Sequence, residues 1–158
     1  FVTLGEELTT LDRYVEIQSI RFPGKFRLVK DIDAAALDVL VPKLMLQPIV
    51  ENAFKHGISP KEEGGVVRIR INPLREKGLL YISVCDNGVG IQPQQLAQLK
   101  AALARPGERW EHIGIYNVAA RLRLLDRNSR FVIRSHPGRG TAVVLYLPLV
   151  ENEEEFEE

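Results

Sequence analysis

The sequence predicts an α+β fold, a two-layer α/β sandwich in which helices cover one face of a mixed, mostly antiparallel sheet. The expected strands come in neighbouring pairs joined by short turns, whereas a doubly wound fold would alternate each strand with a helix. The chain of 158 residues, 45% hydrophobic and 27% charged, is long enough for one domain with an ordinary core. That composition excludes a wholly disordered or collagen-like chain.

The first expected element is an amphipathic helix from Leu4 to Arg21. Its apolar residues recur every three to four positions, Thr3 can cap its first turn, and Pro23 with Gly24 ends it. Residues 26–32 then alternate apolar and polar side chains, which predicts a strand.

A second helix is expected from Lys43 to His56, ended by Gly57 as a C-terminal glycine. The later elements follow from runs rich in Val and Ile, from apolar periodicity and from turn residues. They are strands at 66–72 and 79–85, helices at 93–104 and 114–126, and a final hairpin with strands at 131–135 and 141–147.

The charge is balanced but unevenly placed. Lys plus Arg and Asp plus Glu both number 21, yet the last eight residues hold six Glu, which leaves 21 basic and 15 acidic side chains in residues 1–150. This modest excess suits an anionic ligand and is too weak to predict nucleic-acid binding. With Cys85 as the single cysteine, no intramolecular disulfide can form. No apolar run approaches the roughly 18–20 residues of a membrane span, so we expect a cytoplasmic domain without direct membrane contact.

The helix around residues 47–57 has two different faces. At about 100° per residue, Glu51, Asn52, Lys55 and His56 fall within one sector of about 140°, opposite an apolar sector. A carboxylate, an amide oxygen, an ammonium and an imidazole together suit a magnesium-bound polyphosphate. On these residues alone, a solvated helix face with a Glu51–Lys55 contact is also open.

Three glycine-containing motifs follow. Asp86 stands directly after a strand in D-N-G-V-G-I, where it could accept a hydrogen bond from an exocyclic amine such as that of adenine. Gly114 opens a helix whose free N–H groups could bind phosphate. The string from Gly138 to Thr141 leads into the last strand. Taken singly, these motifs also fit a glycine turn, an ordinary amphipathic helix and a hairpin turn.

In this order, the four motifs resemble the N, G1, G2 and G3 boxes of the GHKL ATPase superfamily, which includes gyrase, histidine kinases and MutL. The string P-x-L-x-L-Q-P-I-V-E-N-A-F-K-H-G looks most like the LytS-type sensor histidine kinases. An upstream Y-x-x-I-x-x-x-R-F, here Tyr14, Ile17, Arg21 and Phe22, adds to this likeness. The resemblance extends from about Leu4 to nearly the end of the chain.

The resemblance implies a Bergerat-type domain that holds ATP between helices and sheet beneath a lid. By this analogy Asn52 binds Mg²⁺, Lys55 a phosphate, and Asp86 the adenine amino group. The lid would span residues 92–112, with Arg105 and Arg109 near the phosphates. Trp110 would be either a lid anchor or a partly buried residue. The implied nucleotide contacts are Asn52, Lys55, His56, Asp86, Gly88, Gly90, Ile91, Gly114, Asn117, Gly140 and Thr141.

The implied activity is transfer of the ATP γ-phosphoryl group to a histidine outside this fragment. Glu51 and Lys55 are the catalytic candidates, with Glu51 acting either as a general base or orienting group or only as an ion-pair partner of Lys55. Residues 1–22 are expected to be the trailing helix of a dimerisation and phosphoacceptor hairpin, residues 23–149 the ATP-binding domain, and residues 150–158 a disordered acidic tail. The implied partners are the protein's own phosphoacceptor helix, a response regulator and a second copy in a homodimer.

Three alternatives stay open: an anti-sigma-factor-like serine kinase, a gyrase- or MutL-like ATPase, and a nucleotide-sensing module without catalysis. The first two usually carry a Glu four residues before the metal-binding Asn, and that position is Pro48 here. Two departures from the kinase pattern concern the lid. His112-Ile113-Gly114 stands where G-x-G is frequent, and no phenylalanine-containing F box precedes it.

Overall fold

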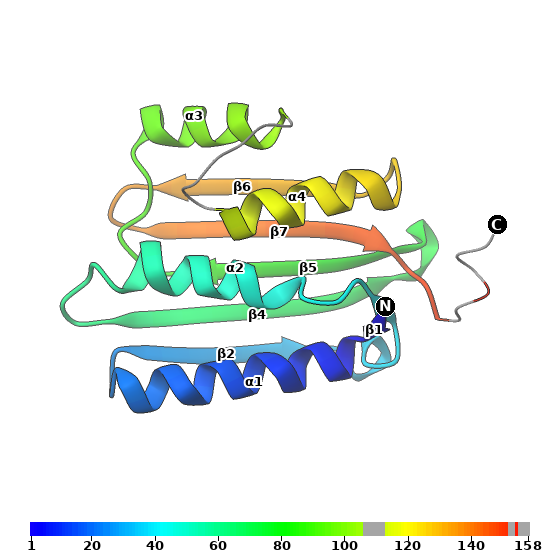
Figure 1. The fold of residues 1–158 in the computed structure, drawn as a ribbon, viewed down its shortest axis with the longest axis horizontal. Helices are drawn as coiled ribbons and strands as arrows, with labels where there is room; N and C mark the ends of the chain where they lie inside the picture. Colours follow the sequence, from blue (N-terminus) through cyan, green and yellow to red (C-terminus); the bar gives the residue numbers. More distant parts are fainter. Residues whose placement is uncertain (106–112, 152–153, 155–158) are drawn as a thin grey trace.

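A computed structural model describes residues 1–105, 113–151 and 154, and a five-stranded sheet in the order β2-β4-β5-β7-β6 is its main feature (Figure 1). The parallel pair β2–β4 lies at one edge, and the other neighbours pair antiparallel. The strands are β2 Phe26–Ile32, β4 Gly65–Leu74, β5 Leu79–Asp86, β6 Arg130–His136 and β7 Gly140–Pro148.

Three helices lie over one face of this sheet, with α1 over β2, α2 over β4 and β5, and α4 over β6 and β7, whereas α3 lies beside the β6 edge (Figure 1). The helices are α1 Leu4–Arg21, α2 Leu46–Asn52, α3 Pro93–Leu103 and α4 Ile113–Leu125. The predicted α+β sandwich with a mixed, mostly antiparallel sheet is therefore confirmed. Two-residue strands β1 Val2–Thr3 and β3 Leu40–Val41 pair with each other, and were too short to predict.

Helix α1 has the predicted bounds and the predicted cap. The Glu6 N–H donates to Thr3 Oγ1, and the Thr3 N–H donates to the Glu6 carboxylate. Leu4, Leu8 and Leu11 of its inner face belong to the same hydrophobic core as the sheet. Residues 1–22 therefore share one core with the rest of the domain, and their expected place in a dimerisation hairpin stays a prediction.

The helix expected from Lys43 to His56 is different in the structure. Its α-helical part begins only at Leu46, because Leu44 has the left-handed φ of 59°. Pro48, which has no N–H to donate, therefore falls in the first turn, where none is needed. From Ala53 to Ile58 the chain forms a π-helix, η2, which is an infrequent form that often marks functional sites.

Gly57 does not end the helix as a cap, which corrects the sequence prediction. It is buried inside η2 and does not have a positive φ. A Cβ there would lie 2.7 Å from Asp86 Oδ1 at the end of β5. The glycine is required by this close approach and not by helix termination.

We expect the inner face of α1 to be needed for stability. Leu11 is 0% exposed, so Leu11→Ala should lower the free energy of unfolding by about 2–5 kcal/mol in urea denaturation. The control Leu124→Ala removes the same atoms from a helix side chain that is 88% exposed, and should change stability by less than about 0.5 kcal/mol. Equal effects of the two substitutions would contradict the placement of α1 in the core.

Candidate functional site

Strand β5 ends on a half-buried carboxylate, that of Asp86. Asp86 pairs with Thr141 of β7, and its Oδ1 accepts a hydrogen bond from the Gly88 N–H at 2.8 Å. Burial raises the pKa of the Asp86 carboxyl, although the N–H groups of Gly88 and Thr141 and the charge of Lys61 act in the opposite direction. A further hydrogen-bond donor would therefore stabilise the ionised form of Asp86.

Two glycines bring this turn into backbone contact with η2. A Cβ on Gly88 would lie 2.2 Å from the carbonyl carbon of Gly57, so neither neighbour leaves room for a side chain. The Val89 N–H donates to the Gly57 carbonyl at 2.9 Å. Two motifs that the sequence presents separately, around Asn52 and around Asp86, are therefore parts of one structure.

Gly90 and Gly140 have φ values of 72° and 122°, which favour glycine. A Cβ would lie 2.0 Å from the His136 carbonyl oxygen at Gly90, and 1.9 Å from the Asp86 carbonyl oxygen at Gly140. Alternate glycines in a turn can also let the backbone pass close to a ligand, and for Gly88 and Gly90 that stays a prediction. The structure shows that the chain's own backbone already leaves no room for a side chain at Gly90 and Gly140.

A buried serine, missed from the sequence, joins three of the predicted residues. Ser135 Oγ accepts from the Ile91 N–H at 2.8 Å, donates to the Gly140 carbonyl at 2.9 Å, and lies 2.8 Å from Thr141 Oγ1. The signal was a polar residue at the inward position of β6, two residues after the buried Ile133.

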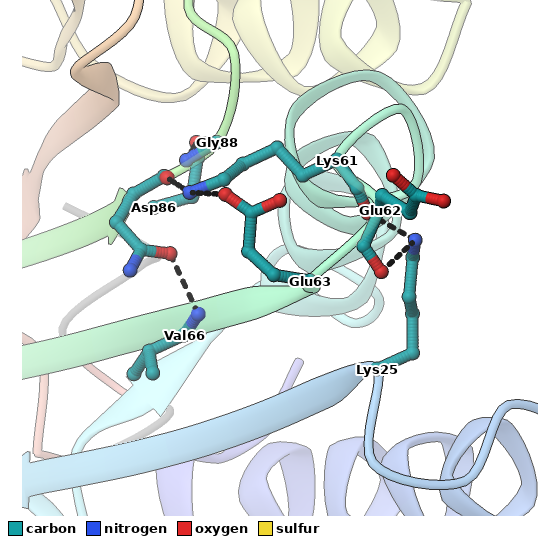
Figure 2. A network of polar contacts seen from close by, with 8 residues as sticks. Lys25, Lys61, Glu62, Glu63, Val66, Asp86 and Gly88 are labelled. Carbon is teal, nitrogen blue, oxygen red and sulfur yellow. Dashed lines mark hydrogen bonds and ion pairs between the residues drawn. The ribbon is translucent and has the colours of Figure 1, made fainter.

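Lys61 is a second residue that the sequence analysis missed. Its Nζ donates to the Asn87 carbonyl at 2.8 Å, and Asn87 Oδ1 accepts from the Val66 N–H at 2.7 Å (Figure 2). Lys25 Nζ in turn donates to the Lys61 carbonyl. These contacts join the loop after η2 to the turn that carries Asp86. No short-range pattern pointed to these contacts, because Lys25 and Asn87 are distant from Lys61 in sequence.

The polar face of the α2–η2 helix lies as predicted. Glu51, Lys55 and His56 are exposed and Asn52 is half-buried, whereas the opposite face is buried in the core. Glu51 Oε1 accepts a hydrogen bond from Gln47 Nε2 at 3.0 Å. In the part of the chain that the structure describes, Glu51 and Lys55 form no ion pair, so this alternative for Glu51 is not supported.

Tyr14 of α1 lies close enough to the polar face of α2–η2 for the charge of Glu51 to affect its pKa. Burial first, and the charge of Glu51 second, raise the pKa of Tyr14 to about 12. The phenol is therefore protonated at neutral pH. The Y-x-x-I-x-x-x-R-F string thus supplies a residue beside the candidate site.

Helix α4 adjoins α2 at its start. A Cβ on Gly114 would lie 3.1 Å from Pro48 Cβ, so the glycine allows close helix packing there. Asn117 is exposed one turn later, and Arg105 is exposed just after α3. Of the predicted lid, residues 92–105 are described and include α3, whereas residues 106–112, Arg109, Trp110 and His112 among them, lie outside the described residues.

The described residues do not form a metal site by themselves. Among the described residues, no three His, Cys, Asp or Glu side chains gather in a way that could hold one. The amide oxygen of Asn52 is a hard ligand, and Mg²⁺ usually takes one or two protein oxygens together with phosphates and waters. This side chain therefore fits a metal shared with a polyphosphate.

Comparison with known proteins identifies a family and several relatives. The family model of histidine kinase-, DNA gyrase B- and HSP90-like ATPases matches residues 38–151. An uncharacterized sensor-like histidine kinase of Staphylococcus epidermidis is 34% identical over 94% of this chain and 28% of its own length. Sensor protein LytS of Bacillus subtilis is 29% identical over 97% of this chain and 26% of its own length. The chain thus spans about a quarter of the length of these relatives.

A solved structure, the catalytic domain of histidine kinase ThkA, has the same fold with a TM-score of 0.67 at 13% identity. The match covers 95% of this chain and 96% of that domain. The unmatched 5% of 158 residues is fewer than the 18 residues of α1, so the shared fold extends into α1.

The fold, the order of the four motifs and these matches agree with the resemblance found in the sequence. The chain belongs to the histidine kinase-, DNA gyrase B- and HSP90-like ATPase family, and its relatives include LytS and other sensor histidine kinases.

Proposed function

We propose that this chain is the ATP-binding catalytic domain of a two-component sensor histidine kinase, and that it directs the γ-phosphoryl group of ATP to a histidine outside residues 1–158. The observation that carries the proposal is the backbone contact of Gly57 with Gly88. It holds the polar face of α2–η2 beside the half-buried carboxylate of Asp86. An adenine-reading group and a phosphate-binding face thus adjoin each other.

In this proposal each group has one task. Asp86 accepts a hydrogen bond from the adenine amino group, and Thr141 lies beside it on β7. Lys55 places a positive charge by the phosphates, and the Asn52 amide oxygen is the protein ligand for Mg²⁺. When held there with the nucleotide, Mg²⁺ would supply positive charge that offsets the negative charge of the phosphates. Catalysis then consists mainly of positioning and charge stabilisation.

Glu51 is the candidate general base or orienting group, since its exposed carboxylate lies one residue from Asn52. A serine-kinase or gyrase-like reaction would need a carboxylate at the position of Pro48. That residue packs against Gly114 and has no group to activate a hydroxyl or water.

The partners follow from the same proposal. They are the phosphoacceptor helix of the full-length protein, a response regulator and a second copy in a homodimer, on the cytoplasmic side of a membrane-anchored sensor. The names of the relatives, sensor kinases that extend well beyond the matched region, support this view. Within the described residues, no helix is long and apolar enough to cross a membrane.

Asp86→Asn should weaken ATP and ADP binding at least about tenfold in calorimetry, because a hydrogen bond to a charged group contributes about 1.5–3 kcal/mol. The thermal unfolding temperature at neutral pH should be unchanged or higher, since the raised pKa means that the folded state disfavours ionised Asp86. In the wild type, the protonated Asp86 carboxyl contributes to the free energy of unfolding at low pH. This contribution is lost as the pH rises through the pKa of Asp86 in the folded state. Any advantage of the variant should therefore shrink on acidification.

The control for this variant is Asp38→Asn, which changes an exposed carboxylate on the loop before β3. Its nucleotide affinity should equal that of the wild type. If Asp86→Asn bound ATP as well as this control, the adenine assignment would be wrong.

Asn52→Ala should abolish the gain in ATP affinity that Mg²⁺ gives, while the fold is retained. The measurement is ATP titration with Mg²⁺ and with EDTA, accompanied by thermal unfolding. Asn72→Ala is the matched control, since Asn72 is also half-buried but alternates on β4 with the buried Ile71 and shares the face of the exposed Arg70, away from the helices. A full Mg²⁺ effect in Asn52→Ala would contradict the metal assignment.

The fragment alone should not label itself with γ-labelled ATP, whereas it should label a supplied phosphoacceptor segment of the full-length protein. The chain has three histidines, His56, His112 and His136. His56 is exposed next to Lys55 on the proposed binding face, and His136 ends β6 at the last hairpin. An acceptor imidazole must approach the γ-phosphate in line from outside the site. Acid-labile label on any of the three in the fragment alone would overturn this expectation.

A further inference from the structure

We propose that Glu7 and Arg121 are positioning residues for the Mg²⁺ and phosphate side of the site. They clamp the turn before α2 from two sides and so fix how α2 presents Asn52 and Lys55. This inference rests on the proposed function, and concerns residues to which neither the four motifs nor the reaction assigns a role.

The buried carboxylate of Glu7 in α1 accepts its hydrogen bonds from backbone N–H groups. It is 3% exposed, and its Oε1 accepts from the Leu44 N–H at 2.7 Å. Its Oε2 accepts from the N–H groups of Met45 at 3.1 Å and Leu46 at 3.2 Å. The first N–H groups of a helix have no partner within it, and Met45 at the N-cap provides no side-chain acceptor. Helix α1 therefore supplies the cap that α2 lacks.

Arg121 of α4 holds the carbonyl side of the same turn. Its guanidinium donates to the Lys43 carbonyl and, at 3.2 Å, to the Leu44 carbonyl. The N–H of Leu44 is thus bound by a residue of α1, and its carbonyl by a residue of α4. Both contacts bridge more than 30 residues of sequence.

Leu44 is the strained residue of this turn. Among the described residues it is the single non-glycine with a positive φ, at 59°. Such a conformation persists only where the surroundings enforce it. The Leu44 side chain is 46% exposed, so its own burial does not enforce it. The charged groups of Glu7 and Arg121 are the contacts that do.

The clamp matters for the site because α2 is short. Asn52 follows Leu46 by six residues, which at 1.5 Å per residue is about 9 Å along the axis. A change at the turn before α2 therefore moves Asn52 and Lys55, the proposed contacts of the metal and of a phosphate. Asp86 is fixed separately by the pairing of β5 with β7 and should keep its place. Positioning errors of about 1 Å can cost orders of magnitude in a reaction.

The test is ATP titration with Mg²⁺ and with EDTA on Glu7→Gln, Arg121→Lys and the double variant, at a temperature where thermal scans show each to be folded. Glu16→Gln and Arg123→Gln are the controls, since both change an exposed charge on the same two helices. The readout is the ratio of the two affinities. A merely structural loss lowers both affinities together and leaves this ratio unchanged.

We expect the ratio to fall at least about tenfold in Glu7→Gln and by a smaller factor in Arg121→Lys. A lysine keeps the positive charge but lacks the planar guanidinium fork that binds the carbonyls of Lys43 and Leu44 together. The double variant should lose less than the product of the single effects, since both residues act on one turn. An unchanged ratio in both single variants, with wild-type protein that shows the Mg²⁺ gain, would overturn the clamp. If Glu7→Gln does not fold, the Arg121→Lys ratio decides alone. Absence of any Mg²⁺ gain in the wild type would instead contradict the proposed function.

Discussion

The site depends on the contact between two backbones that have no side chains at the point where they meet. Gly57 in η2 and Gly88 after β5 approach so closely that a Cβ on either would collide with the other segment or with Asp86. The helix layer and the sheet are thereby joined at the candidate site by main chain. The polar face of α2–η2 can lie beside the half-buried carboxylate of Asp86 only because this contact exists.

The remaining features of α2 follow from the need to keep that contact. The helix is held at its start by Glu7 and Arg121, in its first turn by Gly114 against Pro48, and at its end by Gly57. The π-helical segment from Ala53 to Ile58 contains Gly57 and so makes the contact itself. Lys61 in the loop after η2 and Ser135 on β6 hold the turn that follows Asp86 through hydrogen bonds. Nearly all of these contacts join segments that are far apart in sequence.

This separation explains what could be predicted from the sequence. The α1 helix was predicted to the residue because its capping box and its apolar spacing are local signals. The strands and Asp86 at the end of β5 were found for the same reason, and the order of four motifs indicated the family. The start of α2 was misplaced because it is determined by the left-handed Leu44 and by the carboxylate of Glu7. Gly57 was taken for a cap because the carboxylate that crowds it is 29 residues away in the chain.

The most direct test of the account is an NMR titration of the ¹⁵N-labelled domain with ADP, following the backbone amides of Gly57, Gly88 and Thr141. If adenine binds at Asp86, where η2 meets the sheet, these three amides should shift together along one binding curve. In Asp86→Asn the same shifts should need at least about tenfold more ADP. Shifts confined to other residues, with these amides unmoved at saturating ADP, would contradict the placement of the nucleotide and the role given to the Gly57–Gly88 contact.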